Sequence, residues 1–410
     1  ISMLVNALYN MVDRMYIGHI SQNGALALAG AGVCGPIVTF LTSFGTLVGI
    51  GGSITMGIRM GEKNHKKAEQ VLANSFLVLS IFSVLLTISF LLLKDKLLMW
   101  FGASGATFPF ANTYLTIYTT STFFALMATG LNYFINCQGF PLVGMFTVLI
   151  GAGCNILLDP IFIFGFHMGI AGAAWATVIG QISAFLLYIV VYLRKNPGVT
   201  IHPKYLHLDW RLIRQIYSVG IPSSLMMTMP SVLVGGLNGI LAAFSDTYVA
   251  VLGIYFKLQT FIYMPANGIV QGMRPIIGYN YGAGSKKRVR DTIRYSLISA
   301  AVLMLVGTVV SLAIPDIILS MFQADAELMR AGMEALRLIS LGFLVSSAGV
   351  IFSGVFEALG RGGDSLIISL LRQLVIILPL GYLLSRTMGA AGIWISFPVA
   401  ELVSAVIACL

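Results

Sequence analysis

The sequence predicts an all-α polytopic membrane protein with twelve transmembrane helices in two pseudo-symmetric six-helix lobes. Of its 410 residues, 58% are hydrophobic and only 10% are charged, whereas a soluble domain is about 25% charged. The mean hydropathy is +0.91. Runs of about 20 mostly apolar residues, the length that a spanning helix requires, recur along the whole chain. This composition excludes nearly all soluble enzymes.

Twelve apolar runs are candidate membrane spans. They cover residues 1–20, 30–58, 70–93, 108–136, 140–166, 169–193, 215–243, 247–274, 292–314, 330–357, 364–385 and 389–410. Several runs are longer than a bilayer core requires, and their internal glycines and prolines favour bends. Because the sequence begins and ends inside apolar runs, we expect further residues at both ends.

Basic residues gather directly after spans 2, 6 and 8. Fifteen of the 24 lysines and arginines lie at 59–67, 194–214 and 274–294. Clusters beside apolar spans are typical of cytoplasmic loops, so the net charge of +9 does not indicate nucleic-acid binding. All three clusters follow even-numbered spans. We therefore expect a multi-pass protein of the plasma (cell inner) membrane with both termini in the cytoplasm.

An internal repeat divides the chain into an N-lobe (1–195), a cytoplasmic linker (196–210) and a C-lobe (211–410). A shift of 221 residues places Gly139 on Gly360, and a shift of 220 places 168–172 on 388–392. With six spans in each half, the two repeats are parallel. Two such halves that rock about a central cavity are typical of secondary transporters.

Asp159 lies inside the apolar run 140–166, where an ionised aspartate costs about 2.5–3.5 kcal/mol. Asn155 precedes it by four residues, so both side chains share one helix face. Pro160 follows and removes a backbone donor. An acid, an amide and a helix break at this depth indicate a cation or proton site. The alternative is a structural aspartate that bonds to a neighbouring helix.

Two further polar residues reach the same depth as Asp159. With 1.5 Å rise per residue, Asp13 on span 1 and Thr177 on span 6 also lie roughly 10–12 Å inside the outer end. Carboxylate, amide and hydroxyl oxygens suit Na⁺ or a shared proton, so Asp13, Asn155, Asp159 and Thr177 are the predicted site. The alternatives are a local Asp13–Arg14 pair and a Thr177 hydroxyl bonded to its own backbone.

Four segments resemble motifs of the MATE (multidrug and toxic compound extrusion) transporters. They are YNMVDRMYIG at 9–18, NILLDP at 155–160, GAAWAT at 172–177 and PIIGYNYGA at 275–283. The resemblance implies two lobes of six helices and cation-coupled drug export. It also implies that Asp13, Asn155, Asp159 and Thr177 form the N-lobe cation or proton site, joined by Asn132 on span 4.

One departure from the family pattern concerns the second half. Some relatives place a coupling acid in the seventh helix, but residues 215–244 contain no acid. This absence favours the N-lobe acids as the coupling centre. Glu357 and Glu401 both lie near predicted cytoplasmic ends, and we expect Glu357 to serve a loop close to Arg361.

Cations inside the C-lobe spans are candidates for a substrate cavity. Lys257 and Arg372 both interrupt apolar runs, and Tyr9 and Asn10 belong to the span 1 motif. The alternative for both cations is snorkelling to the inner edge of the membrane. The 25 Phe, 19 Met and 16 Tyr would allow an adaptable cavity for flat organic cations.

The expected function is secondary antiport that exports amphipathic, cationic drugs and toxic compounds in exchange for H⁺ or Na⁺, and thereby gives drug resistance. We expect a monomer among membrane lipids, with no cofactor beyond the coupling ion and no nucleic-acid partner. ATP drive is not expected, because no GxxxxGK[ST] motif is present. One rival, a flippase for lipid-linked oligosaccharides, needs a more cationic cavity. A membrane-embedded enzyme needs a reactive cluster, but the five histidines lie in loops or at span ends.

Overall fold

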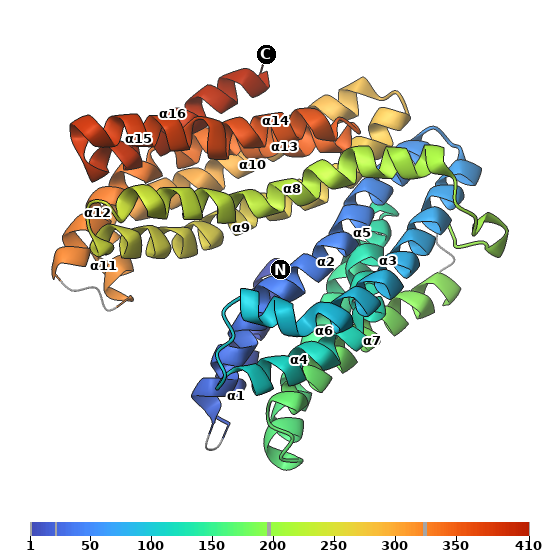
Figure 1. Ribbon diagram of the computed structural model, residues 1–410. Helices are drawn as coiled ribbons and strands as arrows, with labels where there is room; N and C mark the ends of the chain where they lie inside the picture. Colours follow the sequence, from blue (N-terminus) through green and yellow to red (C-terminus); the bar gives the residue numbers. More distant parts are fainter. Residues whose placement is uncertain (1, 21–22, 195–197, 323–325, 410) are drawn as a thin grey trace. The chain divides into compact units, whose positions relative to one another are not determined.

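The computed structural model describes residues 2–20, 23–194, 198–322 and 326–409, and all regular elements in these ranges are helices. The first two residues of the predicted linker, 196–197, and the outermost residues of the first and last predicted spans lie outside the described residues. In chain order (Figure 1) the elements are α1 (Ser2–Gly18), α2 (Gly24–Gly61), α3 (His65–Trp100), α4 (Phe108–Thr120), α5 (Thr122–Cys137), α6 (Pro141–Pro160), η1 (Ile161–Gly165), α7 (Ile170–Arg194), η2 (Pro203–Tyr205), α8 (Trp210–Leu241), α9 (Asp246–Gly282), α10 (Lys286–Ala313), α11 (Pro315–Ser320), α12 (Ala326–Ser340), α13 (Phe343–Ala358), α14 (Gly362–Leu370), η3 (Leu371–Val375), α15 (Ile377–Met388) and α16 (Ala390–Cys409).

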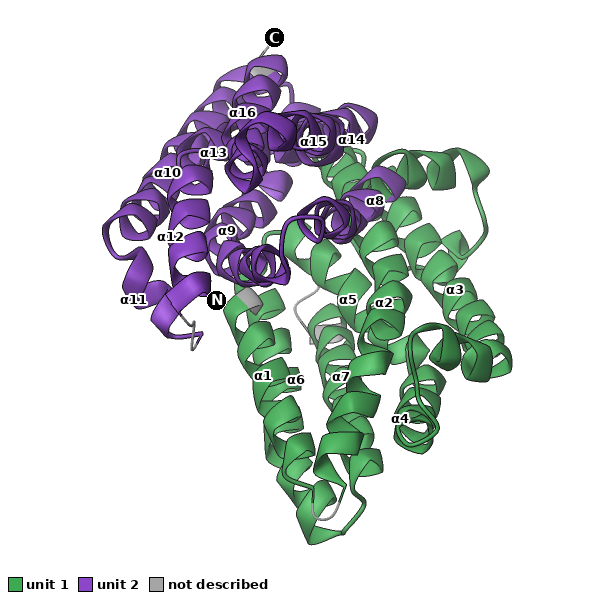
Figure 2. Cartoon of the chain, turned by 60° about the vertical axis from the view of Figure 1, so that its left-hand side comes forward, with its two compact units in different colours: residues 1–220 green, residues 221–410 purple. Residues whose placement is uncertain are grey.

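The helices form two compact units, residues 1–220 and 221–410 (Figure 2). The first unit contains α1 to α7, the connection after α7 and the first residues of α8. Ile213 and Ile216 of α8 are buried in the same apolar cluster as Leu72 of α3 and Phe134 of α5. These contacts explain why the start of α8 belongs to the first unit.

The described helices confirm an all-α, polytopic membrane fold. Nine of them are long and apolar enough to cross a membrane, and a tenth span results if α12 and α13, which meet at a 53° bend, are counted as one. Each of the twelve predicted runs coincides with one helix or with consecutive helices. The apolar runs in the sequence therefore identified the positions of the long helices correctly.

Four predicted spans are interrupted in the structure. Run 108–136 is divided between α4 and α5 and run 330–357 between α12 and α13, while runs 140–166 and 364–385 contain the π-helical turns η1 and η3. At the first break, the Ser121 hydroxyl donates to the Tyr118 carbonyl at 2.8 Å and the Thr122 hydroxyl donates to the Thr119 carbonyl at 2.6 Å. Such side-chain hydrogen bonds to backbone carbonyls often bend helices.

The repeat predicted from glycine spacing reappears in the backbone. Gly139 and Gly360 both have positive φ, +88° and +78°, and each follows the end of a helix in its own half. A Cβ on Gly172 would lie 2.8 Å from a backbone carbon of η1, and a Cβ on Gly392 would lie 2.5 Å from a backbone carbon of α15. The same positions of both halves thus carry the same turn and the same close helix approach.

The basic stretch 274–294 lies mostly on helix rather than in a loop. α9 has 37 residues and continues through Pro265 and Pro275, so it is about 55 Å long, whereas a bilayer core is about 30 Å thick. α10 begins at Lys286, shortly after α9 ends. Five of the six cations of this stretch therefore lie at the start of α10, whereas Arg274 of α9 is mostly buried.

Candidate functional site

Two buried carboxyl groups meet in the first unit. α1 packs against α6, as Figure 2 also shows, and this contact brings Asp13 of α1 to Asp159 in the last turn of α6. Asp13 is 9% exposed and Asp159 is fully buried. Their carboxyl groups are close enough to form a hydrogen bond when one carries a proton. Among the described residues, the Oδ1 atom of Asp13 has no hydrogen-bond partner.

Asn155 connects Asp159 to the next helix. It lies one turn earlier on α6 and is 2% exposed. Its amide is satisfied when Nδ2 donates to Oδ2 of Asp159 at 3.3 Å and Oδ1 accepts from the backbone N–H and the hydroxyl of Thr177, at 3.3 and 3.2 Å. The Thr177 hydroxyl also lies 3.0 Å from the Ala173 carbonyl, the backbone bond considered as an alternative. Both contacts are therefore within its reach.

The helix that carries Asp159 changes its winding directly after the acid. α6 ends at Pro160, which lacks an N–H group, and the π-helical turn η1 follows. Single π-helical turns frequently occur at functional sites, because they redirect the helix and free backbone groups. The predicted helix break is thus present, as a change of winding rather than an end of the helix.

Tyrosines surround the acid pair, and sequence reasoning missed two of them. Tyr114 of α4 lies near Thr177 and Asp13. Tyr118, one turn further, accepts a hydrogen bond from Gln181 Nε2 at 3.1 Å. A signal was present, since the two tyrosines are four residues apart and Gln181 follows Thr177 by four. Tyr9 and Tyr114 thus place hydroxyl groups near the acids.

The chemistry of this cluster suits a monovalent cation or a proton. Asp13, Asp159, Asn155 and Thr177 supply two carboxyl groups, an amide and a hydroxyl, which are hard oxygen donors. In the ranges that the structure describes, no group of three His, Cys, Asp or Glu side chains could hold a metal ion. Two carboxylates side by side in apolar surroundings repel each other, and a bound cation or proton would relieve that repulsion.

Asn132 lies in a separate polar network. Its Nδ2 is 2.6 Å from the Tyr188 hydroxyl and 3.4 Å from Thr147, and its Oδ1 accepts from Asn136 at 2.8 Å. Thr147 precedes Asn155 by two helical turns, about 12 Å along α6. The hydrogen bonds of Asn132 therefore do not include the acids, and its place in the cation site stays a prediction.

The four predicted cavity residues have different environments. Tyr9 is half-buried, one turn before Asp13, and lies close to both acids. Asn10 is exposed and its Nδ2 donates to a backbone carbonyl one turn earlier. Lys257 is exposed on α9 and makes no ion pair with the residues described. Arg372 is mostly buried and faces an acid, so it does not snorkel to a helix end.

The two buried acids of the second unit, Glu357 and Glu401, both face arginines rather than lying in loops at helix ends. Glu357 is 1% exposed, forms an ion pair with Arg274 of α9 and accepts a hydrogen bond from Ser223 at 2.7 Å. The predicted loop role beside Arg361 is wrong, because Arg361 pairs with Asp364 at 2.6 Å. The fold of α13 onto α8 and α9 determines these partners.

Glu401 also departs from its predicted place near a helix end. It lies in the middle of α16, where its Oε2 is 3.9 Å from Nη1 of Arg372 in η3. The second unit therefore buries acids together with arginines, whereas the first unit buries two acids side by side.

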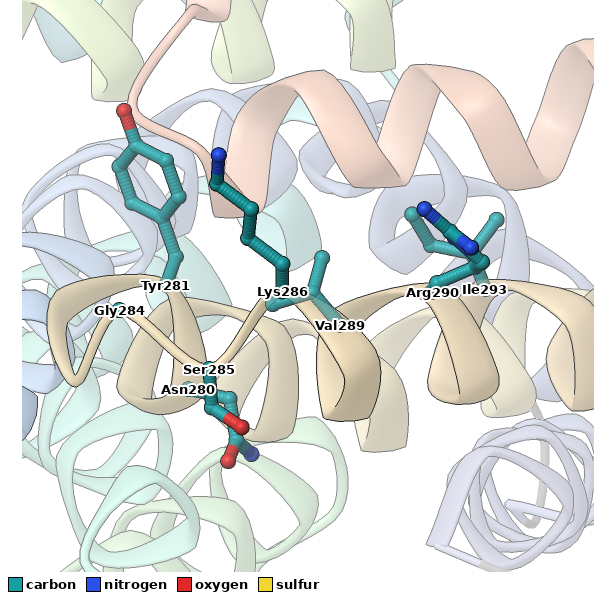
Figure 3. Close-up of a pocket in the computed structure, with 8 residues that line it drawn as sticks. All are labelled: Asn280, Tyr281, Gly284, Ser285, Lys286, Val289, Arg290 and Ile293. Carbon is teal, nitrogen blue, oxygen red and sulfur yellow. The ribbon is translucent and has the colours of Figure 1, made fainter.

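A separate pocket of about 410 Å³ lies at the turn between α9 and α10 in the second unit. Figure 3 shows Tyr281, Lys286 and Arg290 on one side of this turn, and Asn280 and Ser285 on the other. None of the predicted site residues lines this pocket.

Comparison with known proteins gives a consistent result. The MatE family model matches residues 1–161 and 222–383. The chain is 30% identical over 411 residues to the multidrug export protein MepA of Staphylococcus haemolyticus (strain JCSC1435), covering 100% of this chain and 89% of that protein. It is 28% identical over 413 residues to MepA of Staphylococcus saprophyticus, covering 100% of this chain and 90% of the relative.

Solved structures share the fold. One, described as MATE in the bent conformation, has a TM-score of 0.92 at 24% identity and covers 99% of this chain and 90% of its own. Another, described as an outward-facing multidrug resistance MATE family transporter of the MOP superfamily, has a TM-score of 0.89 at 24% identity, with 99% and 91% covered. The matched family model, which includes Asp13 and Asp159, and the relative at 30% identity show that the chain belongs to the MATE family of multi-pass membrane transporters and is not an enzyme.

Proposed function

We propose that this protein is a secondary antiporter of the cell membrane that exports amphipathic, cationic organic compounds in exchange for protons or sodium ions. Membership of the MATE family and the names of relatives such as MepA, a multidrug export protein, support export of drug-like compounds. The rival function, flipping of lipid-linked oligosaccharides, finds no support in these matches.

The observation that carries the proposal is the contact between Asp13 and Asp159. Both acids are buried, they come from different helices, and no arginine or lysine forms an ion pair with either in the described parts of the chain. A permanently ionised pair in such a place is costly, because each carboxylate raises the electrostatic energy of the other. A site of this kind is stable with an ion bound and strained without one, which is what ion coupling requires.

The mechanism follows from the helices that carry the acids. When a proton or Na⁺ binds between Asp13 and Asp159, the repulsion between α1 and α6 is relieved and the two helices pack closely. Loss of the ion weakens this packing. Coupling requires only that the exported compound and the ion favour opposite access states, and each then lowers the affinity for the other.

The proposal includes an orientation in the membrane. The basic stretches at 59–67, 194–214 and 274–294 follow even-numbered spans, which favours a cytoplasmic position for both termini under the positive-inside rule. We also propose that the protein acts as a monomer among membrane lipids and uses no cofactor beyond its coupling ion.

The decisive experiment is ethidium efflux from energised cells and from proteoliposomes. Wild type, Asp13→Asn and Asp159→Asn are compared under a proton gradient alone and a sodium gradient alone. We expect wild type to export under one gradient, which identifies the ion. In both variants the initial rate of ethidium efflux should fall at least ~10-fold, because a neutral amide cannot take up and release a charge.

Asp95→Asn is the matched control, because Asp95 is an exposed acid of α3 in the same unit. This variant should export at the wild-type rate. Membrane abundance is measured for every variant. Normal efflux by Asp13→Asn and Asp159→Asn at normal abundance would show that the acid pair is structural and would overturn the proposal.

A further inference from the structure

The second unit contains a buried arginine and a buried glutamate whose charged groups face each other without a hydrogen bond. Arg372 lies in the π-helical turn η3 and Glu401 on α16, and their nearest atoms, Nη1 and Oε2, are 3.9 Å apart. The two side chains are 13% and 12% exposed. This separation exceeds the hydrogen-bond range of about 2.7–3.2 Å, so the two charges attract each other without a hydrogen bond.

Several polar atoms of this pair are unused. Among the described residues, Nε and Nη1 of Arg372 and Oε2 of Glu401 are buried and have no hydrogen-bond partner. Buried polar groups in proteins almost always have partners, and an arginine usually binds a carboxylate through two parallel hydrogen bonds. Nε of Arg274 and Oε2 of Glu357 also have no hydrogen-bond partner, but those two side chains are in direct contact and Glu357 accepts a hydrogen bond from a serine. Arg372 and Glu401 share no hydrogen bond, so this pair is poorly suited to a purely structural role.

The surrounding backbone gives the pair room to rearrange. A π-helical turn adds a residue to the helix and redirects the side chain, and such turns are frequent at functional sites. Gly349 of α13 faces the pair. A Cβ there would lie 3.5 Å from Cδ of Arg372 and 3.7 Å from Oε2 of Glu401. The glycine thus leaves a space of about one methyl group beside both charges.

Few other ionisable groups act on Glu401. From α9, Tyr255 and Tyr263 lie near both charges, and the Tyr263 hydroxyl donates to Ser346 at 2.8 Å. On the other elements packed against α16, Arg372 is the charged group that acts on Glu401. The remaining charged side chains there are exposed on α12 or lie in contacts elsewhere. They are Glu327, Arg330, Glu334, Arg337, Glu357 in its pair with Arg274, the pair Arg361–Asp364, and Arg386 beside Tyr382.

The internal repeat relates Glu401 to the site in the first unit. The 220-residue shift that superimposes 168–172 on 388–392 places Glu401 on Gln181. Gln181 donates to Tyr118, which lies near Tyr9 beside the acid pair. The second half therefore carries a titratable acid at the position where the first half carries an amide.

We propose that Glu401 is a second proton-binding site of the transport cycle and that Arg372 is the internal cation that neutralises Glu401 when the proton leaves. On proton binding, the carboxylate becomes a neutral acid and the guanidinium turns away. On release, the proton goes to water and the carboxylate attracts Arg372 again. The inference rests on the proposed ion-coupled export, but it can be tested without any transport assay.

The first test is infrared difference spectroscopy of the purified full chain in lipid nanodiscs, between acidic and alkaline buffer. Wild type is compared with Glu401→Gln, with the double variant Arg372→Gln/Glu401→Gln and with Asp364→Asn, an exposed acid of the same unit. We expect both variants without Glu401 to lose one component of the protonated-carboxyl band that Asp364→Asn retains. A wild-type band in both Glu401 variants would overturn the inference.

A second readout separates proton exchange from a structural role. Ethidium binding and the protons released per bound ethidium are measured in weak buffer. In the double variant, which buries no unpaired charge, we expect ethidium binding to be retained while proton release falls to about half, because one of two linked sites is gone. Unchanged proton release would mean that the pair is structural.

The same spectra distinguish this inference from the proposed function. Asp13→Asn and Asp159→Asn should remove different band components from Glu401→Gln. If Asp13→Asn and Asp159→Asn leave export intact and still show the infrared band component of Glu401, the acid pair is not the coupling centre. The assignment of Glu401 as a proton site then still stands. If they abolish export and Glu401→Gln leaves the spectrum unchanged, the proposed function holds and the second site is refuted.

Discussion

The two halves of this transporter bury charge in opposite ways. The first unit places Asp13 against Asp159, two groups of like charge. The second unit buries Glu357 with Arg274, and Glu401 faces Arg372. The halves share turns and helix contacts at repeat positions, so the difference lies in a few side chains on a common scaffold.

This difference determines what each half needs from outside. Two carboxylates in an apolar site are destabilised until a cation or proton joins them. A carboxylate beside a guanidinium is already neutral as a pair and needs no ligand to stay buried. The first unit is thus suited to respond to an external ion, whereas the second carries its own counter-ions. Single substitutions should therefore have opposite effects on stability in the two halves.

The largest effect is expected when one partner of the buried Arg274–Glu357 ion pair of the second unit is removed. Glu357→Gln leaves the buried Arg274 without its counter-ion and should lower the free energy of unfolding by about 3–5 kcal/mol. Thermal unfolding followed by size-exclusion chromatography measures the change. The double variant Arg274→Gln/Glu357→Gln should recover most of the loss. A double variant as unstable as the single one would contradict charge pairing as the cause.

A smaller loss of stability is expected at Gly172 and Gly392, where equivalent helices within each half pack closely against each other. A Cβ on Gly172 would lie 2.8 Å from a backbone carbon, so Gly172→Ala forces α7 away from η1 and should cost about 1–3 kcal/mol. Gly392→Ala should cost a similar amount in the second unit. Gly153→Ala is the control, because its Cβ would have no neighbour within 4 Å. Thermal unfolding that ranks Gly153→Ala with the other two would refute this explanation.

Much of the architecture followed from the sequence, because apolar run length and glycine spacing act locally. Span direction and helical rise predicted that Asp13, Asp159 and Thr177 lie close together, and the structure brings them together with Asn155, although their depth in the membrane and their role in ion binding stay predictions. The position of Asn132 could not be predicted this way, because depth within a span does not reveal which helix face it occupies.

The ion pairs of the second unit were also beyond sequence reasoning. Glu357 and Arg274 are 83 residues apart in the chain, and they meet because α13 packs on α9. No periodicity encodes such a pairing. The helix break at Ser121 was missed because a serine inside an apolar run is usually compatible with a continuous helix.

Neutralising one acid of the first unit should raise the stability, which is opposite to the effect expected for Glu357→Gln. Asp159→Asn removes a like-charge contact, so in alkaline buffer its free energy of unfolding should exceed that of wild type, because the wild-type pair then carries two charges that repel each other. In acidic buffer a proton on the wild-type pair removes the repulsion, and the difference should vanish. Thermal unfolding across this pH range tests the sign, with Asp95→Asn as control. A lower stability of Asp159→Asn in alkaline buffer would indicate that Asp159 has a structural bond that the amide cannot replace.

The smallest effect on stability is expected at the exposed ion pair of the second unit. This pair tests whether burial, rather than charge pairing alone, determines the effect. Arg361 and Asp364 are 2.6 Å apart, closer than Arg372 and Glu401, but their side chains are 62% and 41% exposed. Water screens such a pair, so Arg361→Gln should change the free energy of unfolding by less than about 1 kcal/mol and leave ethidium efflux at the wild-type rate. A loss as large as that of Glu357→Gln would mean that short distance rather than burial determines the strength of these pairs, and the contrast between the two halves would then need another cause.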